Sequence, residues 1–328
     1  IIVKNGNIIE KWLWYKLPVF NKVKKNLNKK QSISGVTNYL RQAVHRQMVS
    51  DVPLGAFLSG GLDSSAIVSF AKELNPDIRC FSIETRGKQD QGVIDDLPYA
   101  RRVAKHLNVP LDVVTIESRK MADDLESMVI QLDEPLADPA ALNVMYISRL
   151  AREQNIKVLL SGAGGDDLFT GYRRHYALHL ERYWDWLPKS FRIGMESVSQ
   201  NVNVNSSIGR QIKKMFNGAG LDSTDRLINY FRWSDDSTLR SLYSPEFKQQ
   251  LSGSNSNQVM QDFLVPILEN TSSLDKILSL EQRFFLADHN LNYTDKMSMA
   301  VGVEVRVPFL DLDLVKFSAQ IPDKFKQR

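Results

Sequence analysis

The segment LSGGLDSS, Leu58 to Ser65, combines residue types that bind phosphate groups. Gly60 and Gly61 let the backbone approach a ligand closely, because glycine has no side chain. The three serines add uncharged hydroxyl donors. Apolar runs before and after the segment indicate a strand, a turn and a helix start, where backbone N–H groups and the helix dipole point toward an anion. The segment therefore predicts a phosphate-binding loop, although it is neither a P-loop with GKS or GKT nor a GxGxxG loop.

The aspartate of this segment, Asp63, favours a bound cation. A carboxylate repels phosphate unless a cation lies between them, and Mg²⁺ is ordinarily held by one or two carboxylates together with phosphate oxygens. The alternative is that Asp63 only caps the helix and that the glycines only form a tight turn. The chemistry of this segment alone leaves both interpretations open.

A second segment, KVLLSGAGGDDLFTGY, repeats the same order. An apolar run is followed by Ser161 and Gly162, then by further glycines, and then by Asp166 and Asp167. Ligands of parallel sheets bind at the carboxyl ends of the strands. Two such loops at the ends of two strands can therefore face one nucleotide and share its metal ion.

The elements around these loops alternate between helix and strand. Apolar spacing of three and four from Ile33 to Met48 predicts a helix, which Pro53 ends. The runs PLGAFLSG, IRCFSIE, PLDVVTI and IKVLLSG then read as strands, with helical stretches between them. This alternation predicts an α/β fold, a parallel sheet flanked by helices. Beyond Asp166 no clear strand appears, and helical spacing predicts a mostly helical C-terminal half.

The composition excludes several classes of protein. The 42 basic and 38 acidic residues leave a net charge of +4 without a basic stripe, which argues against a nucleic-acid partner. The aromatic residues of YRRHYALHLERYWDW have helical spacing and favour packing, and His175 and His179 lack a third metal ligand. The single cysteine, Cys80, excludes a disulfide framework. No apolar run is long enough for a membrane span, so we expect a cytoplasmic protein.

Two motifs carry a resemblance to a known family. SGGLDSS resembles the pyrophosphate-binding loop (PP-loop) of ATP pyrophosphatases that make acyl-adenylates. The second loop, with GVEVRVPFLD at Gly302 to Asp311, resembles the C-terminal synthetase domain of glutamine-hydrolysing asparagine synthetases. The similarity runs from about Tyr39 to Pro322. It implies an adenine nucleotide alpha-hydrolase-like fold and a ligase that forms C–N bonds: the carboxylate of a small molecule attacks the α-phosphate of ATP, pyrophosphate leaves, and ammonia converts the acyl-adenylate into an amide.

The resemblance also implies roles for individual residues. Asp63 and Asp166 would bind Mg²⁺ and act in catalysis. From its charge and its place in the stretch TDKMSMAVGVEVRVPFLD, Lys296 is a further catalytic candidate, since it or Arg306 could contact phosphate or substrate. Lys296 and Arg306 could instead form a structural ion-pair set with Asp295 and Glu304. The pyrophosphate would be held by Ser59, Gly60, Gly61, Asp63, Ser64 and Ser65, and adenosine by Leu58, Ile83, Ser161 and Gly162.

The resemblance implies a domain organisation as well. Residues 1–32, with the lysine-rich run NKVKKNLNKKQS, are expected to be a linker or the remnant of an upstream domain. Residues 33–328 would form the synthetase domain, divided into an α/β nucleotide-binding part (33–170) and a mainly helical part (171–328). The first residue is Ile and not Met, which predicts a fragment or a processed chain.

Three departures from the family affect the expected function. Asparagine synthetases read SGEG where this chain has SGAG, so Ala163 puts aspartate as the substrate in doubt. The chain begins with Ile1, whereas the glutaminase half of such enzymes begins with a cysteine nucleophile. The expectation is therefore that ammonia would come from a glutaminase domain not present in this chain. The sequence ends at Arg328, before the lysine-bearing segment of the family.

Other functions stay open beside asparagine synthetase chemistry. One is a different PP-loop amidotransferase that adenylates a sugar or another carboxylate. A tRNA-modifying enzyme with the same loop is a further possibility, against which the modest charge argues. The third is a catalytically inactive nucleotide-binding domain, which Ala163 suggests and the pair Asp63 and Asp166 opposes.

Overall fold

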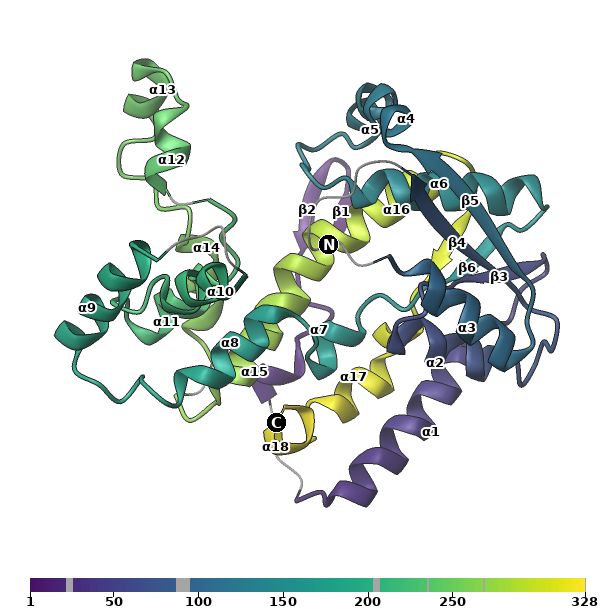
Figure 1. The fold of residues 1–328 in the computed structure, drawn as a ribbon, viewed down its shortest axis with the longest axis horizontal. Coiled ribbons are helices and arrows are strands. Elements are labelled where there is room, and N and C mark those ends of the chain that lie inside the picture. The colour runs from purple at the N-terminus through teal and green to yellow at the C-terminus, as the bar shows by residue number, and fades with distance from the viewer. Residues whose placement is uncertain (22–25, 87–94, 203–206, 235, 268, 328) are drawn as a thin grey trace. The chain divides into compact units, whose positions relative to one another are not determined.

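The computed structural model describes residues 1–21, 26–86, 95–202, 207–234, 236–267 and 269–327 (Figure 1). The chain forms two compact units. The sheet unit comprises Lys25–Gly171 and Glu281–Lys326, and the helical unit comprises Ile1–Lys24, Tyr172–Leu280 and Gln327–Arg328. Among the described residues, no helix combines the length and the apolar character that crossing a bilayer requires.

The centre of the sheet unit is a five-stranded sheet with the strand order β5-β4-β3-β6-β7. Every neighbouring pair of its strands is parallel. The strands are β3 (Leu54–Phe57), β4 (Arg79–Arg86), β5 (Leu111–Glu117), β6 (Val158–Leu160) and β7 (Glu304–Arg306). The two strands that precede the glycine loops, β3 and β6, pair directly, so that their carboxyl ends lie side by side.

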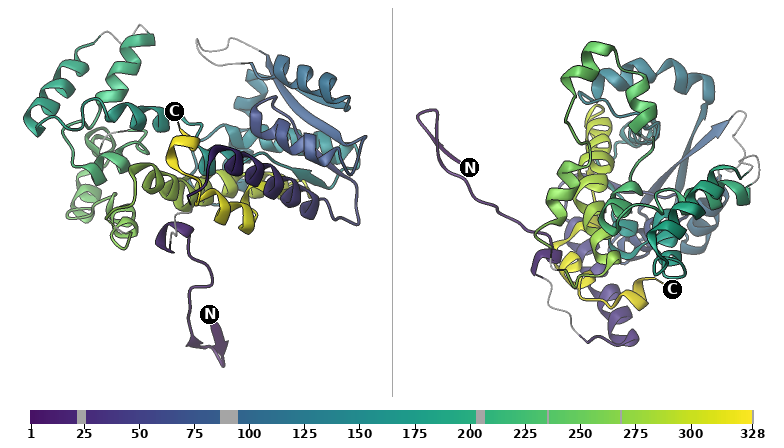
Figure 2. Two further views of the ribbon diagram at one scale, coloured as in Figure 1. Left: turned by 90° about the horizontal axis from the view of Figure 1, so that it is seen from below. Right: turned by 90° about the vertical axis from the view of Figure 1, so that its left-hand side faces the viewer.

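Helices cover both faces of this sheet (Figure 2). Successive strand residues point to opposite faces, and the core divides accordingly. Ala56, Cys80 and Leu160 are buried with α1, α2 and α3 on one face. Phe81 and Leu159 are buried on the other, which α6 and α16 cover. The helices of the sheet unit are α1 (Lys29–Gln47), α2 (Leu62–Ala71), α3 (Leu97–Leu107), α4 (Ser118–Asp123), α5 (Leu125–Gln131), α6 (Ala140–Glu153), α7 (Gly165–Phe169), η2 (Glu281–Asn290), α16 (Leu291–Met299), η3 (Pro308–Leu310), α17 (Leu312–Ser318) and α18 (Asp323–Lys326).

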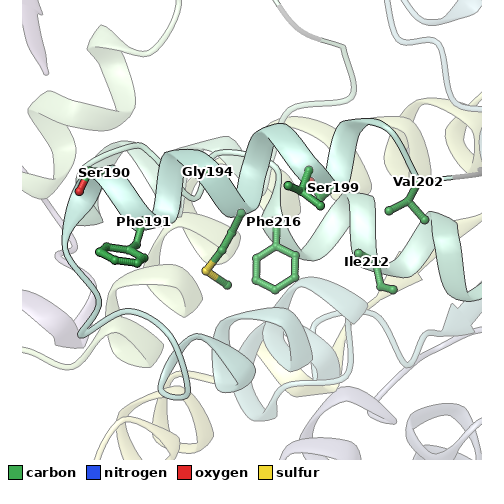
Figure 3. Close-up of a pocket in the computed structure, with 9 residues that line it drawn as sticks. Ser190, Phe191, Gly194, Ser199, Val202, Ile212 and Phe216 are labelled. Carbon is green, nitrogen blue, oxygen red and sulfur yellow. The ribbon is translucent and has the colours of Figure 1, made fainter.

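The helical unit has one small antiparallel hairpin among its described residues, β1 (Ile2–Lys4) with β2 (Asn7–Glu10). Its helices are η1 (Pro18–Asn21), α8 (Arg173–Glu181), α9 (Lys189–Gln200), α10 (Ser207–Phe216), α11 (Ser223–Asn229), α12 (Asp236–Ser241), α13 (Pro245–Gln250), α14 (Gln258–Leu264) and α15 (Ser273–Leu280). An apolar hollow of about 680 Å³ lies between α9 and α10. Phe191 of α9 and Phe216 of α10 are among the residues that line it (Figure 3).

The fold class expected from the sequence is confirmed: a parallel sheet flanked by helices, followed by mostly helical structure. Two details differ. The expected absence of a strand beyond Asp166 is wrong, because β7 pairs with β6 at the edge of the sheet. Helix α1 begins at Lys29 and not at Ile33, because Asn28 and Gln31 form a capping box. The Gln31 N–H donates to Asn28 Oδ1 and the Asn28 N–H donates to Gln31 Oε1, each over 2.9 Å.

Candidate active site

The first glycine loop connects β3 to α2, and its geometry depends on Gly60. This residue has a φ of +80°, which favours glycine strongly. A Cβ on Gly60 would also lie less than 3.0 Å from backbone atoms of Tyr99 and Ala100. Gly60 therefore lets the loop turn sharply while it packs against the first turn of α3.

No side chain caps the start of α2, whose N-cap residue is Gly61. The alternative that Asp63 serves as a helix cap is therefore wrong. The serine hydroxyls lie within the loop: Ser59 Oγ is 3.0 Å from Ser64 Oγ and accepts from the Gly61 N–H over 3.3 Å, and Ser65 Oγ donates to the Gly61 carbonyl over 2.6 Å. First-turn N–H groups with hydroxyls beside them form the kind of site that binds an anion.

The second glycine loop connects β6 to α7 and packs directly on the first. The Ser161 N–H donates to the Arg306 carbonyl over 2.8 Å, which keeps the start of the loop in the sheet. A Cβ on Gly162 would lie 2.7 Å from the Ser64 nitrogen, so the two loops meet backbone to backbone. Gly164, with a φ of +89°, then turns the chain into α7, which carries Asp166 and Asp167 in its first turn.

A cavity of about 880 Å³ lies where the two loops meet. Both predicted metal ligands, Asp63 and Asp166, line it, and so does Ala163. From the predicted nucleotide-binding set, the lining includes Ser59, Gly61, Ser64, Ser161 and Gly162. The apolar part of the lining includes Val36, Leu40, Phe70, Phe169 and Phe309.

The two carboxylates influence each other. Burial, and next the negative charge of Asp166, raises the pKa of Asp63 from 3.8 to about 6. Like charges held close together in a partly buried site disfavour the ionised form of each carboxyl group. A bound cation would remove this repulsion.

The donor set matches Mg²⁺ in its chemistry. The described residues contain no group of three or more His, Cys, Asp or Glu side chains that could hold a metal ion. Magnesium is usually bound by one or two carboxylates, with the remaining positions filled by water and the phosphates of a substrate. Asp63 and Asp166, in a cavity beside the uncapped start of α2, fit that pattern.

Other predicted residues lie outside the cavity. Gly60 packs against α3, and the Ser65 hydroxyl is bonded within its own loop. Leu58 is 1% exposed and belongs to the core, and Ile83 of β4 packs between the apolar clusters around α6. Their contacts with a nucleotide stay predictions.

Lys296 also lies outside the cavity. Its ammonium group, on α16, is 2.6 Å from Asp133 Oδ2, and the hydrogen bond to Asp133 is the main cause that raises the pKa of Lys296. Arg306 is 2.7 Å from Glu304 and donates to two backbone carbonyls at the end of α1, those of Gln47 and Val49. Glu304 is the partner expected for Arg306, whereas the pairing of Lys296 with Asp133 was not expected. A catalytic role of Lys296 stays a prediction.

Sequence reasoning missed several residues of the cavity. Leu40 belongs to the apolar spacing that predicted a helix and Phe309 belongs to the motif GVEVRVPFLD, but neither was assigned to the site. Thr170 and Gly171 were missed as well, although they end the motif DDLFTGY. The sign available in the sequence was the spacing of Asp166 and Gly171, which places a glycine five residues after an aspartate at the start of a short helix.

The fold and site together define a class of protein: an α/β protein in which two glycine loops and two aspartates, Asp63 and Asp166, line one cavity at the carboxyl ends of parallel strands. Residues 35–328 match the family model of asparagine synthase. The chain belongs to the asparagine synthase family.

Curated relatives agree with this assignment. Glutamine-hydrolyzing asparagine synthetase 1 of Bacillus subtilis is 29% identical over 299 residues, 90% of this chain and 45% of the relative. Asparagine synthetase 3 of the same bacterium is 26% identical over 90% of this chain and 43% of its own length. The amidase chyE of Penicillium rubens is 24% identical over 91% of this chain and 47% of its own length. The chain thus spans about half the length of the curated relatives it matches.

Proposed function

We propose that this chain is the synthetase part of an ATP-dependent, C–N bond-forming ligase. In this reaction the carboxylate of a small molecule attacks the α-phosphate of ATP, pyrophosphate leaves, and ammonia then attacks the acyl carbon and releases AMP. The observation that carries the proposal is the cavity in which the anion-binding start of α2 and the pair Asp63 and Asp166 lie together.

The first loop would bind the pyrophosphate part of ATP. The backbone at Gly61 and the hydroxyls of Ser59 and Ser64 line the cavity at the helix start, where donors for phosphate oxygens are concentrated. A phosphoryl-centre reaction needs positioning and charge neutralisation more than a protein nucleophile. Asp63 and Asp166 would hold a Mg²⁺ ion, whose charge neutralises the phosphates when it is bound.

The identity of the carboxylate substrate depends on the second loop. Ala163 lines the same cavity as the carboxylate pair. A glutamate at this position could hold an α-ammonium group or accept a proton from ammonia, and alanine can do neither. We therefore propose that the substrate is a carboxylate other than aspartate, such as a sugar acid.

Ammonia in this scheme comes from a glutaminase domain outside residues 1–328. Two of the relatives are named as glutamine-hydrolyzing enzymes, and this chain covers less than half of each. The cytosol, where ATP and glutamine are both available, is the compartment we propose.

The test is pyrophosphate release from Mg-ATP with ammonia and a panel of carboxylic acids, using the protein at its full natural length. We expect release that depends on one class of acid and that Asp63→Asn abolishes. Aspartate should be a poor substrate. Asparagine formation from aspartate with a kcat/KM of about 10⁴–10⁸ M⁻¹s⁻¹ would overturn the assignment of the substrate. Absence of release with every acid, although the protein is folded, would overturn the ligase assignment.

A further inference from the structure

Each of the two carboxylates in the cavity lies directly against a glycine. A Cβ built on Gly165 would be less than 3.0 Å from the Asp63 Cγ and from both of its carboxyl oxygens. A Cβ built on Gly171 would be less than 3.0 Å from the Asp166 Cγ and Oδ1. In both cases the three nearest atoms all belong to the aspartate side chain.

These glycines are required for space and not for backbone conformation. Neither Gly165 nor Gly171 is among the glycines with a positive φ. They differ in this from Gly60, which has a positive φ and packs against backbone atoms. A carboxylate can rotate away from an added methyl group, whereas a neighbouring backbone cannot. An alanine at position 165 or 171 should therefore move a carboxylate without disrupting the fold.

The turn at Thr170 brings Gly171 against Asp166. Thr170 has a φ of +72° and a ψ of 159°, a conformation that is rare for any residue except glycine and unfavourable for a β-branched one. Two hydrogen bonds hold it: its N–H donates to the Asp166 carbonyl over 3.0 Å, and its hydroxyl donates to the Lys326 carbonyl over 2.9 Å. The chain thus adopts a strained turn directly beside the predicted metal ligand.

We propose that Gly165 and Gly171 are positioning residues that keep Asp63 and Asp166 directed at one shared cation. This inference rests on the proposed function. The absence of a side chain at both positions lets the backbone pack on the carboxylates, which restricts their rotation while both residues line the cavity. The second loop thus positions the aspartate of the first loop as well as its own, because Gly165 lies against Asp63 and Gly171 lies against Asp166.

The experiment compares ATP binding to the parent, Gly171→Ala and Gly165→Ala by calorimetry, with Mg²⁺ and with EDTA. We expect both variants to lose about ten- to one-hundredfold in affinity with Mg²⁺, the range found when the partners of metal ligands are altered. Affinity in EDTA and the melting temperature should change little. Gly194→Ala is the matched control, because its Cβ meets nothing within 4 Å, and it should bind as the parent does.

A double-mutant cycle separates positioning from general damage. If Gly171 acts only through the Asp166 carboxylate, Gly171→Ala should cause no further loss of Mg²⁺-dependent binding in an Asp166→Asn background. An equal loss in both backgrounds would overturn the proposal.

A ligand-free crystal structure of Gly171→Ala gives a readout that does not depend on the proposed function. We expect the Asp166 carboxylate to have rotated while the main chain at 170 and 171 stays in place. An unmoved carboxylate with a shifted main chain would refute the positioning role. If the parent binds no Mg-ATP at all, the proposed function fails, and this structure still decides the role of Gly171.

Discussion

Replacing Asp63 with asparagine should stabilise the ligand-free protein while it destroys Mg²⁺-dependent ATP binding. Asparagine has nearly the same shape as aspartate and carries no charge. Burial and the charge of Asp166 raise the pKa of Asp63 from 3.8 to about 6, so the ionised carboxylate makes folding less favourable at neutral pH. Removal of that charge removes the penalty.

The magnitude follows from the two pKa values. An interval of about 2 pH units corresponds to about 3 kcal/mol at 1.36 kcal/mol per pH unit. Water reaches the half-buried carboxylate and screens its charge, so we expect about 1–2 kcal/mol. Because the pKa is higher in the folded state, the parent loses stability relative to the variant as the pH rises from about 4 to about 6. The difference should then be constant above pH 6 and about half as large at pH 5.

The assay is urea unfolding of the parent and Asp63→Asn at pH 5 and pH 7.5 without divalent cations. Asp77→Asn, a change at an exposed position after α2, serves as the control and should stay within about 0.5 kcal/mol. A stabilisation by Asp63→Asn that is the same at both pH values, or no stabilisation at pH 7.5, would refute the electrostatic reasoning.

Three further predictions concern stability and are checked by urea unfolding. Gly194→Ala should stabilise the helical unit by about 0.5–1 kcal/mol, because Gly194 lies within α9 and its Cβ would meet open space; a loss of stability would contradict this. Arg226→Met should cost about 3–5 kcal/mol, because it leaves the buried Glu181, 3.0 Å from Arg226 Nε, without its ion-pair partner. Lys189→Met, which breaks an exposed pair, should cost less than about 1 kcal/mol, and equal costs would refute the argument. Asn28→Ala should cost about 1 kcal/mol, because it removes the capping box of α1, and an unchanged midpoint would show that the cap contributes nothing.

The sequence was informative about the central strands because their signals are local. The runs that became β3, β4, β5 and β6 are apolar and separated by helical spacing, which together specify a parallel sheet. Strand β7 was missed because it has only three residues and its place depends on pairing with a strand about 146 positions earlier, as in the register of Val158 with Glu304. The π-type helix η2 was read as ordinary helix, because apolar spacing does not distinguish the two.

The residues of the candidate site that come directly after a strand could be predicted from the sequence. The glycine and aspartate segments each come directly after a strand, so the meeting of Asp63 and Asp166 in one cavity could be anticipated. The partners of Lys296 and the roles of Gly165 and Gly171 could not. They depend on which atoms lie within a few ångströms after folding, and the sequence spacing of Asp133 and Lys296 carries no such information.

The measurement that tests the central claim most directly is calorimetric titration of ATP into the parent and Asp63→Asn, with Mg²⁺ and with EDTA. If the two glycine loops form one Mg-ATP site, the parent should bind ATP much more tightly with Mg²⁺ than with EDTA, and Asp63→Asn should abolish this difference although it is the more stable protein. Binding to Asp63→Asn as tight as to the parent, or a parent whose affinity is the same in EDTA, would contradict the account.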